Sequence, residues 1–171
     1  MSKKDQLIQS DLIKESFKEA FKESIPLVTT LEITQSCNFK CDHCYNYDRS
    51  APPPKETFKN PMSDSEITQT IKEISDLGGL YLNISGGEVL THKSLNYFVE
   101  YAKSLNLLVK IKTNGALLNR DKLQGLYDIG LDGLDISIYG DNAKTYKEFT
   151  KSQDFPQVKQ SLKDSKEIGL D

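Results

Sequence analysis

The chain has 171 residues, of which 37% are hydrophobic and 27% charged, and this composition is typical of one globular domain with a sizeable core. The formal net charge of −3 provides neither the basic surface that nucleic-acid binding requires nor a polybasic membrane anchor. No apolar run reaches the length of a signal-peptide core or a membrane-spanning helix. We therefore expect no nucleic-acid partner and no membrane partner.

The first predicted element is an amphipathic helix over residues 5–24, which Pro26 ends. We treat residues 1–26 as an N-terminal helical extension and residues 27–171 as the core domain. Residues 27–34 follow as an apolar, β-branched run, and this pattern predicts a buried parallel strand. Residues 50–61 contain three consecutive prolines and are expected to form an extended surface loop.

Helices and strands alternate through the rest of the chain. The segment from Ser63 to Glu66 is a capping box that opens a helix, and Gly78 and Gly79 end it. Later strands are predicted at residues 80–85, 107–113 and 134–139, and later helices at residues 93–105 and 121–129 and around Val158, Leu162 and Ile168. This alternation predicts an α/β fold with a parallel sheet, in which loops at the carboxyl ends of the strands build the site.

Three cysteines, Cys37, Cys41 and Cys44, are the only ones in the sequence, and they follow the first predicted strand directly. Their spacing lets all three thiolates face one soft metal centre. A [4Fe–4S] cluster normally takes four cysteines, so three would leave one iron open to an external molecule. A zinc site and three reduced cysteines without a ligand are the alternatives. The odd number argues against a disulfide framework and for a reducing, cytoplasmic compartment.

The spacing C-x3-C-x2-C after a first strand resembles the signature of radical S-adenosylmethionine (radical SAM) enzymes. Three later segments match that family in order: Gly86-Gly87-Glu88, Thr113-Asn114-Gly115 and residues 135–139. The resemblance implies a partial parallel (βα) barrel, with about four βα units after an N-terminal helix. The sequence around Tyr45 looks most like the SPASM-type branch, whose members often modify peptides or proteins.

The resemblance also assigns site residues. The three cysteines would hold the [4Fe–4S] cluster. Glu88 and the two glycines before it would contact the amino group of SAM, while three polar residues after later strands would line its pocket and one histidine would make a further cofactor contact. The expected SAM contacts are Gly86, Gly87, Glu88, Thr113, Asn114, Ser137 and His43. Taken singly, these residues fit tight turns, a small polar strand residue and a packing histidine equally well.

The chemistry implied by the resemblance is one-electron chemistry. A reduced cluster would cleave SAM to methionine and a 5′-deoxyadenosyl radical, which abstracts hydrogen from a substrate. The expected partners are a low-potential electron donor and an unidentified substrate, with peptides and proteins as candidates.

Family cores usually carry six βα units, whereas four are predicted here. We therefore expect residues 27–171 to be an incomplete radical SAM core, from a truncated or split gene product. Its last strand would be an apolar edge that a partner chain could complete. The alternative is a truncated, non-catalytic iron–sulfur or zinc-binding interaction module.

Overall fold

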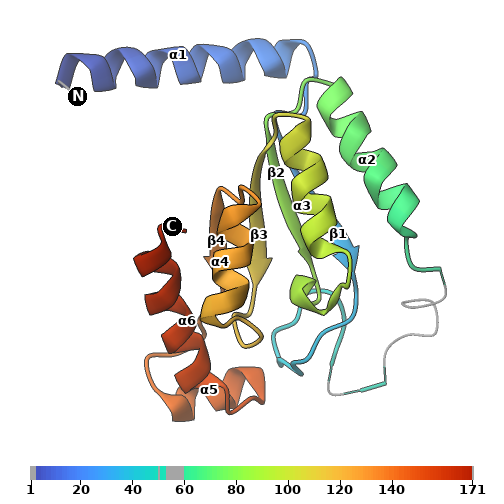
Figure 1. Cartoon of the computed structure of the whole chain (residues 1–171), viewed down its shortest axis with the longest axis vertical. Helices are drawn as coiled ribbons and strands as arrows, with labels where there is room; N and C mark the ends of the chain where they lie inside the picture. Colours follow the sequence, from blue (N-terminus) through green and yellow to red (C-terminus); the bar gives the residue numbers. More distant parts are fainter. Residues whose placement is uncertain (1–2, 50, 53–59, 171) are drawn as a thin grey trace.

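The computed structural model describes residues 3–49, 51–52 and 60–170 (Figure 1). In this part of the chain, helices and parallel strands alternate after a leading helix. The strands are β1 (Val28–Thr34), β2 (Tyr81–Gly86), β3 (Leu108–Thr113) and β4 (Gly133–Ile136). The helices are α1 (Lys3–Lys22), α2 (Asp64–Asp76), the short 3-10 helix η1 (Val89–Thr91), α3 (Leu95–Ser104), α4 (Arg120–Asp128), α5 (Ala143–Thr150) and α6 (Phe155–Ile168).

The four strands form one parallel sheet in the order β1-β2-β3-β4. Its register places Leu31, Ile84, Ile111 and Leu134 in one row across all four strands. This row packs in the main hydrophobic core together with apolar side chains of α2, α3 and α4. The predicted α/β class, with four βα units of a partial barrel after a leading helix, is confirmed.

The sheet has one covered face and one open face. Side chains alternate between buried and exposed along β3, because successive residues of a strand point to opposite faces. Val109 and Ile111 are buried in the core, whereas Lys110 and Lys112 are exposed. In Figure 1, α3 and α4 lie in front of the sheet, and α1 lies beyond the end at which the strands begin.

Three element predictions need correction. The buried strand predicted at residues 27–34 is largely exposed, because β1 is an edge strand and only Ile33 in it is buried. The last strand ends at Ile136, so Ser137 and Tyr139 lie in the loop after it. Helix α5 was not predicted, although the Asn142 side chain caps it by accepting hydrogen bonds from two backbone N–H groups. Of the predicted loop at residues 50–61, residues 50 and 53–59 lie outside the described chain.

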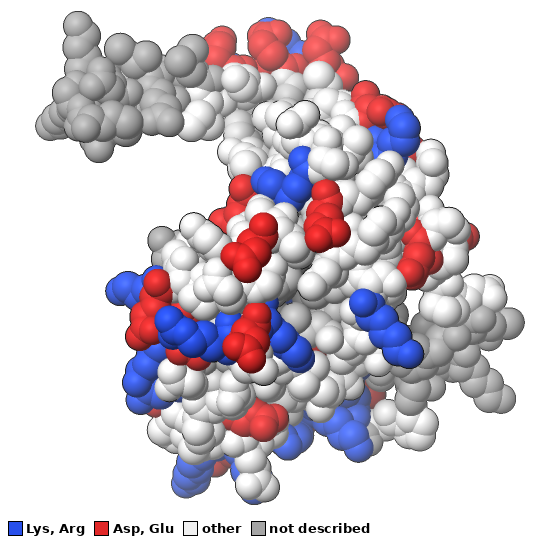
Figure 2. All heavy atoms as spheres, viewed as in Figure 1, with Lys and Arg blue, Asp and Glu red and all other residues white. Residues whose placement is uncertain are grey.

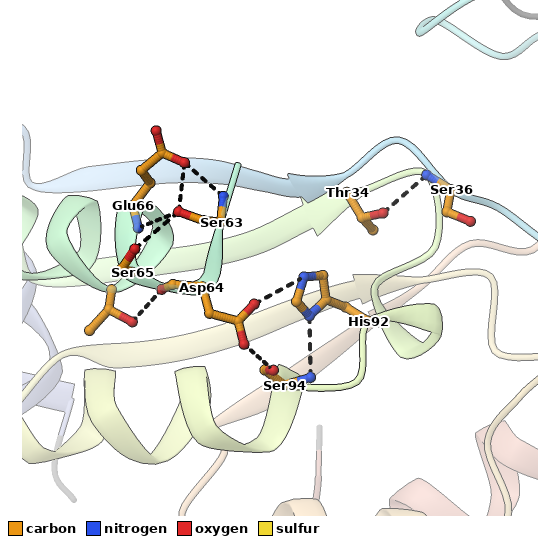
Figure 3. A network of polar contacts seen from close by, with 9 residues as sticks. Thr34, Ser36, Ser63, Asp64, Ser65, Glu66, His92 and Ser94 are labelled. Carbon is orange, nitrogen blue, oxygen red and sulfur yellow. Dashed lines mark hydrogen bonds and ion pairs between the residues drawn. The ribbon is translucent and has the colours of Figure 1, made fainter. Parts of the chain in front are cut away.

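The predicted capping box of α2 is present, and it stands beside a second polar cluster (Figure 3). Ser63 Oγ accepts from the N–H of Glu66, while the Glu66 carboxylate accepts from the N–H of Ser63 at 2.7 Å. The hydroxyl of Ser94 donates to the Asp64 carboxylate, and His92 Nδ1 accepts from the N–H of Ser94 at 3.2 Å. These contacts join the start of α2 to the start of α3.

Acidic and basic side chains are interspersed on the face seen in Figure 2. Among the described residues, no helix is both long enough and apolar enough to cross a bilayer.

The neighbours Phe98 and Tyr97 on α3 provide a test of the core. Phe98 is fully buried, whereas Tyr97 is 51% exposed. We expect Phe98→Ala to lower the free energy of unfolding by about 3–5 kcal/mol, because truncation leaves a cavity among α3 and the strands. The matched change Tyr97→Ala should cost about 0.5 kcal/mol or less. Urea denaturation of both variants measures the difference, and equal losses would contradict this core.

Candidate cofactor site

The carboxyl ends of all four strands open into one pocket. Every residue predicted for the site lines this pocket except Glu88. The predicted residues in its lining are Cys37, Cys41, His43, Cys44, Gly86, Gly87, Thr113, Asn114 and Ser137. They come from the last residues of β2 and β3 and from the loops after β1, β2, β3 and β4. The fold therefore gathers segments that lie far apart in the sequence at one edge of the sheet, as expected for a parallel α/β fold.

The cysteine loop is held in place by α5 and α6. Phe39 is buried against Tyr146 of α5 and Val158 of α6, and Cys37 and Cys41 pack beside this cluster. The N–H of Asp42 donates to the carbonyl of Phe149 at 3.1 Å. The Asp42 carboxylate also pairs with Lys151 at 2.5 Å. The loop is thus anchored by the last two helices, of which α5 was missed from the sequence.

The three thiols are free, and their environments differ. Burial raises the pKa of Cys37 and raises that of Cys41 to about 11. Burial also acts to raise the pKa of Cys44, but hydrogen bonds, first of all from Arg49, lower it below its usual value. Arg49 Nε donates to Cys44 Sγ at 2.9 Å. Cys44 is therefore the thiol whose thiolate is favoured.

The donor set can be tested against the two metal centres. Among the described residues, no three His, Cys, Asp or Glu side chains converge on a position for a single metal ion. A cluster does not require such convergence, because each cysteine binds a different iron. Three thiols in one anchored loop, beside a buried cation, fit an anionic cluster.

Gly86 and Gly87 bring the loop after β2 against the start of the cysteine loop. The N–H of Gly87 donates to the carbonyl of Thr34 at 2.7 Å, and the N–H of Glu88 donates to the carbonyl of Ser36 at 2.8 Å. A Cβ on Gly86, whose φ is +147°, would lie 2.3 Å from the Thr34 oxygen. A Cβ on Gly87 would lie 2.4 Å from the Ser36 oxygen. Only glycine fits this close approach.

Glu88 joins this loop to the loop after β3. Its side chain is 1% exposed, and its carboxylate accepts hydrogen bonds from Thr113 Oγ1 at 2.7 Å, from the N–H of Asn114 at 2.7 Å and from the N–H of Leu90 at 3.1 Å. Burial raises the pKa of Glu88 although these donors act to lower it. The carboxylate is therefore engaged inside the protein and does not line the pocket, which differs from the predicted contact with an ammonium group.

The remaining predicted residues surround the pocket from the loops after β1, β3 and β4. Asn114 Nδ2 donates to Asn38 Oδ1 at 2.8 Å, and the N–H of Ser137 donates to the carbonyl of Thr113 at 2.9 Å. The ring of His43 lies 4.0 Å from the ring of Tyr139, between centroids.

Sequence reasoning missed seven residues that line the pocket: Phe39, Tyr45, Asn46, Arg49, Ser85, Lys112 and Tyr139. Tyr139 lies at the end of the matched fourth segment, and the period of β3 could have indicated that Lys112 points away from the core. No pattern in the sequence marks Arg49.

The comparisons with known proteins identify the family. The family model described as the radical SAM superfamily matches residues 31–171. This chain therefore belongs to the radical SAM superfamily, whose members use a [4Fe–4S] cluster and SAM.

Curated relatives match at about one third identity. A probable GTP 3′,8-cyclase of Methanococcus maripaludis is 33% identical over 141 residues, which are 82% of this chain and 45% of the relative. The PqqA peptide cyclase of Rhodopseudomonas palustris is 31% identical over 132 residues, which are 77% of this chain and 34% of the relative. The chain thus spans less than half the length of these enzymes.

Solved structures share the fold. The enzyme anSMEcpe with bound AdoMet superposes with a TM-score of 0.67 at 17% identity, over 83% of this chain and 42% of the other. Streptococcus suis SuiB bound to its precursor peptide SuiA gives a TM-score of 0.71 at 18% identity, over 92% and 35%. The predicted resemblance to the superfamily is confirmed, and the similar proteins include enzymes of the SPASM type such as the PqqA peptide cyclase.

The close approach at Gly87 can be tested with an added methyl group. We expect Gly87→Ala to displace the Ser36 carbonyl and with it the cysteine loop, so that iron affinity falls by about 10–100-fold. The control is Gly125→Ala in α4, where a Cβ meets no atom within 4 Å. Iron content after anaerobic reconstitution measures both variants. Equal iron content in the two would contradict the proposed constraint.

The role of Glu88 can be tested by removing its charge. In Glu88→Gln the amide would present N–H groups to donors, so we expect the free energy of unfolding to fall by about 1–3 kcal/mol. Glu100→Gln, at an exposed position of α3, is the control. Because burial raises the folded pKa of Glu88, ionisation costs the folded state stability as pH rises through that pKa. As pH rises from acidic to neutral, the stability of Glu88→Gln should therefore increase relative to that of the control, because the variant lacks this loss, and denaturation at several pH values measures the difference.

Proposed function

We propose that this chain carries the cofactor-binding part of a radical SAM enzyme, in which Cys37, Cys41 and Cys44 hold a [4Fe–4S] cluster and the adjoining pocket takes SAM. The observation that carries this proposal is the shared pocket: the three free thiols and the polar residues after β2, β3 and β4 line the same cavity. When bound, the cluster supplies the electron that cleaves SAM to methionine and a 5′-deoxyadenosyl radical, which abstracts hydrogen from the substrate.

The residues of the pocket would orient SAM. Gly86 and Gly87 line the pocket, and because neither carries a side chain the loop after β2 can lie against the start of the cysteine loop. Their backbone would face the amino-acid part of SAM. Asn114 and Ser137 offer short polar groups to its amino-acid or ribose part. Thr113 lines the same wall, although its hydroxyl donates to Glu88. In this proposal Glu88 acts through Thr113 and Asn114 and has no direct contact with SAM.

His43 would supply the remaining cofactor contact. It lies between the ligand positions Cys41 and Cys44, and its ring packs against Tyr139 and more distantly against Phe149, with centroids 4.0 and 6.0 Å apart. These contacts hold the backbone around His43 at the rim of the pocket, where it can meet the adenine of SAM.

For the whole protein we propose a peptide or protein substrate. This proposal is supported by relatives named as a PqqA peptide cyclase and as SuiB bound to a precursor peptide. A low-potential electron donor would reduce the cluster. The three free cysteines are consistent with a reducing, cytoplasmic compartment.

The proposed organisation keeps residues 1–26 as an extension and residues 27–171 as an incomplete core. β4 is the last strand in the sheet order, and in the described chain no strand pairs with its outer edge. We propose that further strands extend the sheet at this edge, whether from a longer chain or from a partner chain.

Anaerobic reconstitution with iron and sulfide tests the function. We expect about four iron atoms per chain, as in a [4Fe–4S] cluster, and release of 5′-deoxyadenosine after addition of dithionite and SAM. Cys41→Ala should lose both, because one iron loses its thiolate.

The other outcomes separate the alternatives. A cluster without nucleoside would mean that this segment binds the cluster but does not complete the SAM site. Zinc without iron would support a structural interaction module, and a chain without any metal would contradict the proposal.

A further inference from the structure

Arg49 carries a buried positive charge beside the cysteine loop. The residue is 8% exposed and follows Cys44 by five positions. Its Nε donates to Cys44 Sγ at 2.9 Å, and Nη1 donates to the hydroxyl of Tyr47 at 2.9 Å. Both terminal nitrogens contact the carbonyl of Gln35 at 3.4 Å, and the guanidinium lies 4.5 Å from the centre of the Tyr47 ring. The side chain is thus held by three residues, Gln35, Cys44 and Tyr47.

None of these contacts is to a carboxylate. Arg49 therefore differs from Lys112, the other cation that lines the pocket, whose ammonium pairs with Asp135 at 2.9 Å. A buried charge without an opposite charge is strongly destabilising. Burial acts to lower the pKa of Arg49, whereas Cys44 and Cys37 are the first groups whose interactions raise it, ahead of Tyr47. An anionic group at the cysteine loop would therefore be stabilised by the charge of Arg49.

A cluster bound by three thiolates would be such a group. Uptake of one electron makes it more negative by one unit, so a fixed cation nearby stabilises the reduced state more than the oxidised state. Hydrogen bonds to the ligand sulfurs act in the same direction, and both effects are among the means by which proteins set cluster potentials. An Arg is suited to this position because it stays charged when buried.

We infer that Arg49 is a positioning residue that orients the Cys44 thiolate and raises the midpoint potential of the cluster, which makes the cluster easier to reduce. This inference rests on the proposed function, because it requires a cluster at the cysteine loop. The redox step is the uptake of one electron by [4Fe–4S]²⁺ to give [4Fe–4S]⁺, with no bond made or broken. In the experiment, dithionite supplies the electron.

The test is a redox titration of the reconstituted chain without SAM, followed by electron paramagnetic resonance of the reduced cluster. In Arg49→Gln we expect the equilibrium constant for reduction to fall about tenfold, which for one electron is a shift of about 59 mV to lower potential. Arg49→Lys retains the charge and should recover most of this shift. Lys40→Gln removes the same charge from an exposed position of the same loop, where water and salt screen it. We expect less than about a twofold change in that control.

Several outcomes would overturn the inference. An unchanged potential in Arg49→Gln would show that the charge does not act on the cluster, as would a Lys variant that behaves like the Gln variant. If Arg49→Gln assembles no cluster, the Arg49→Lys variant distinguishes an electrostatic role of Arg49 from a structural one. A cluster at the wild-type potential in Arg49→Lys supports the charge as the requirement, and loss of the cluster there also would indicate a purely structural role. A wild-type chain without iron would instead contradict the proposed function, so the two failures are distinguishable.

Discussion

A buried carboxylate at the carboxyl edge of the sheet must have its charge satisfied within the protein, and Glu88 achieves this by accepting three hydrogen bonds from the segments after β2 and β3. Two of these donors, Thr113 and Asn114, line the pocket. The N–H of Gly87 donates to the end of β1 at Thr34, and the N–H of Glu88 donates to Ser36 at the start of the cysteine loop. The hydrogen bonds of Gly87 and Glu88 therefore join the segments after β1, β2 and β3, and these bonds determine the shape of the pocket.

The cysteine loop depends on a second, independent support. Phe39 packs in a small cluster with Tyr146 and Val158, which is separate from the main core beneath the sheet. The loop leaves β1 at one edge of the sheet, while these helices follow β4 at the other edge. The three cysteines are consequently held between elements from the two opposite edges of the sheet. This explains why the site needs the last two helices even though the described pocket is lined only by residues 37–139.

The features of the fold and the site that could be predicted from the sequence are those determined by residues close together in the chain. The alternation of strands and helices has a local cause in hydrophobic period and capping, so the capping box at Ser63 and the order of elements were correctly anticipated. The position of a strand at the edge of a sheet depends on all the strands together, so the exposure of β1 could not be predicted from its own residues. The motif segments predicted which residues would meet at one edge. They did not reveal that the Glu88 carboxylate turns inward, because two of its donors lie 25 and 26 residues further along the chain. Nor did they reveal that Arg49 turns toward Cys44, because no sequence pattern marks that contact.

The relatives of this chain indicate which properties of an enzyme a segment like this one can determine. Relatives that match it at 31–33% identity are named for different reactions, a GTP 3′,8-cyclase and a PqqA peptide cyclase. A segment that such enzymes share cannot by itself be what distinguishes their substrates. It can carry what they have in common, and the features found here are of that kind: an anchored cysteine loop, glycines that permit close approach, and polar residues at the ends of parallel strands. The buried charge of Arg49 would likewise act on the cluster and not on the substrate.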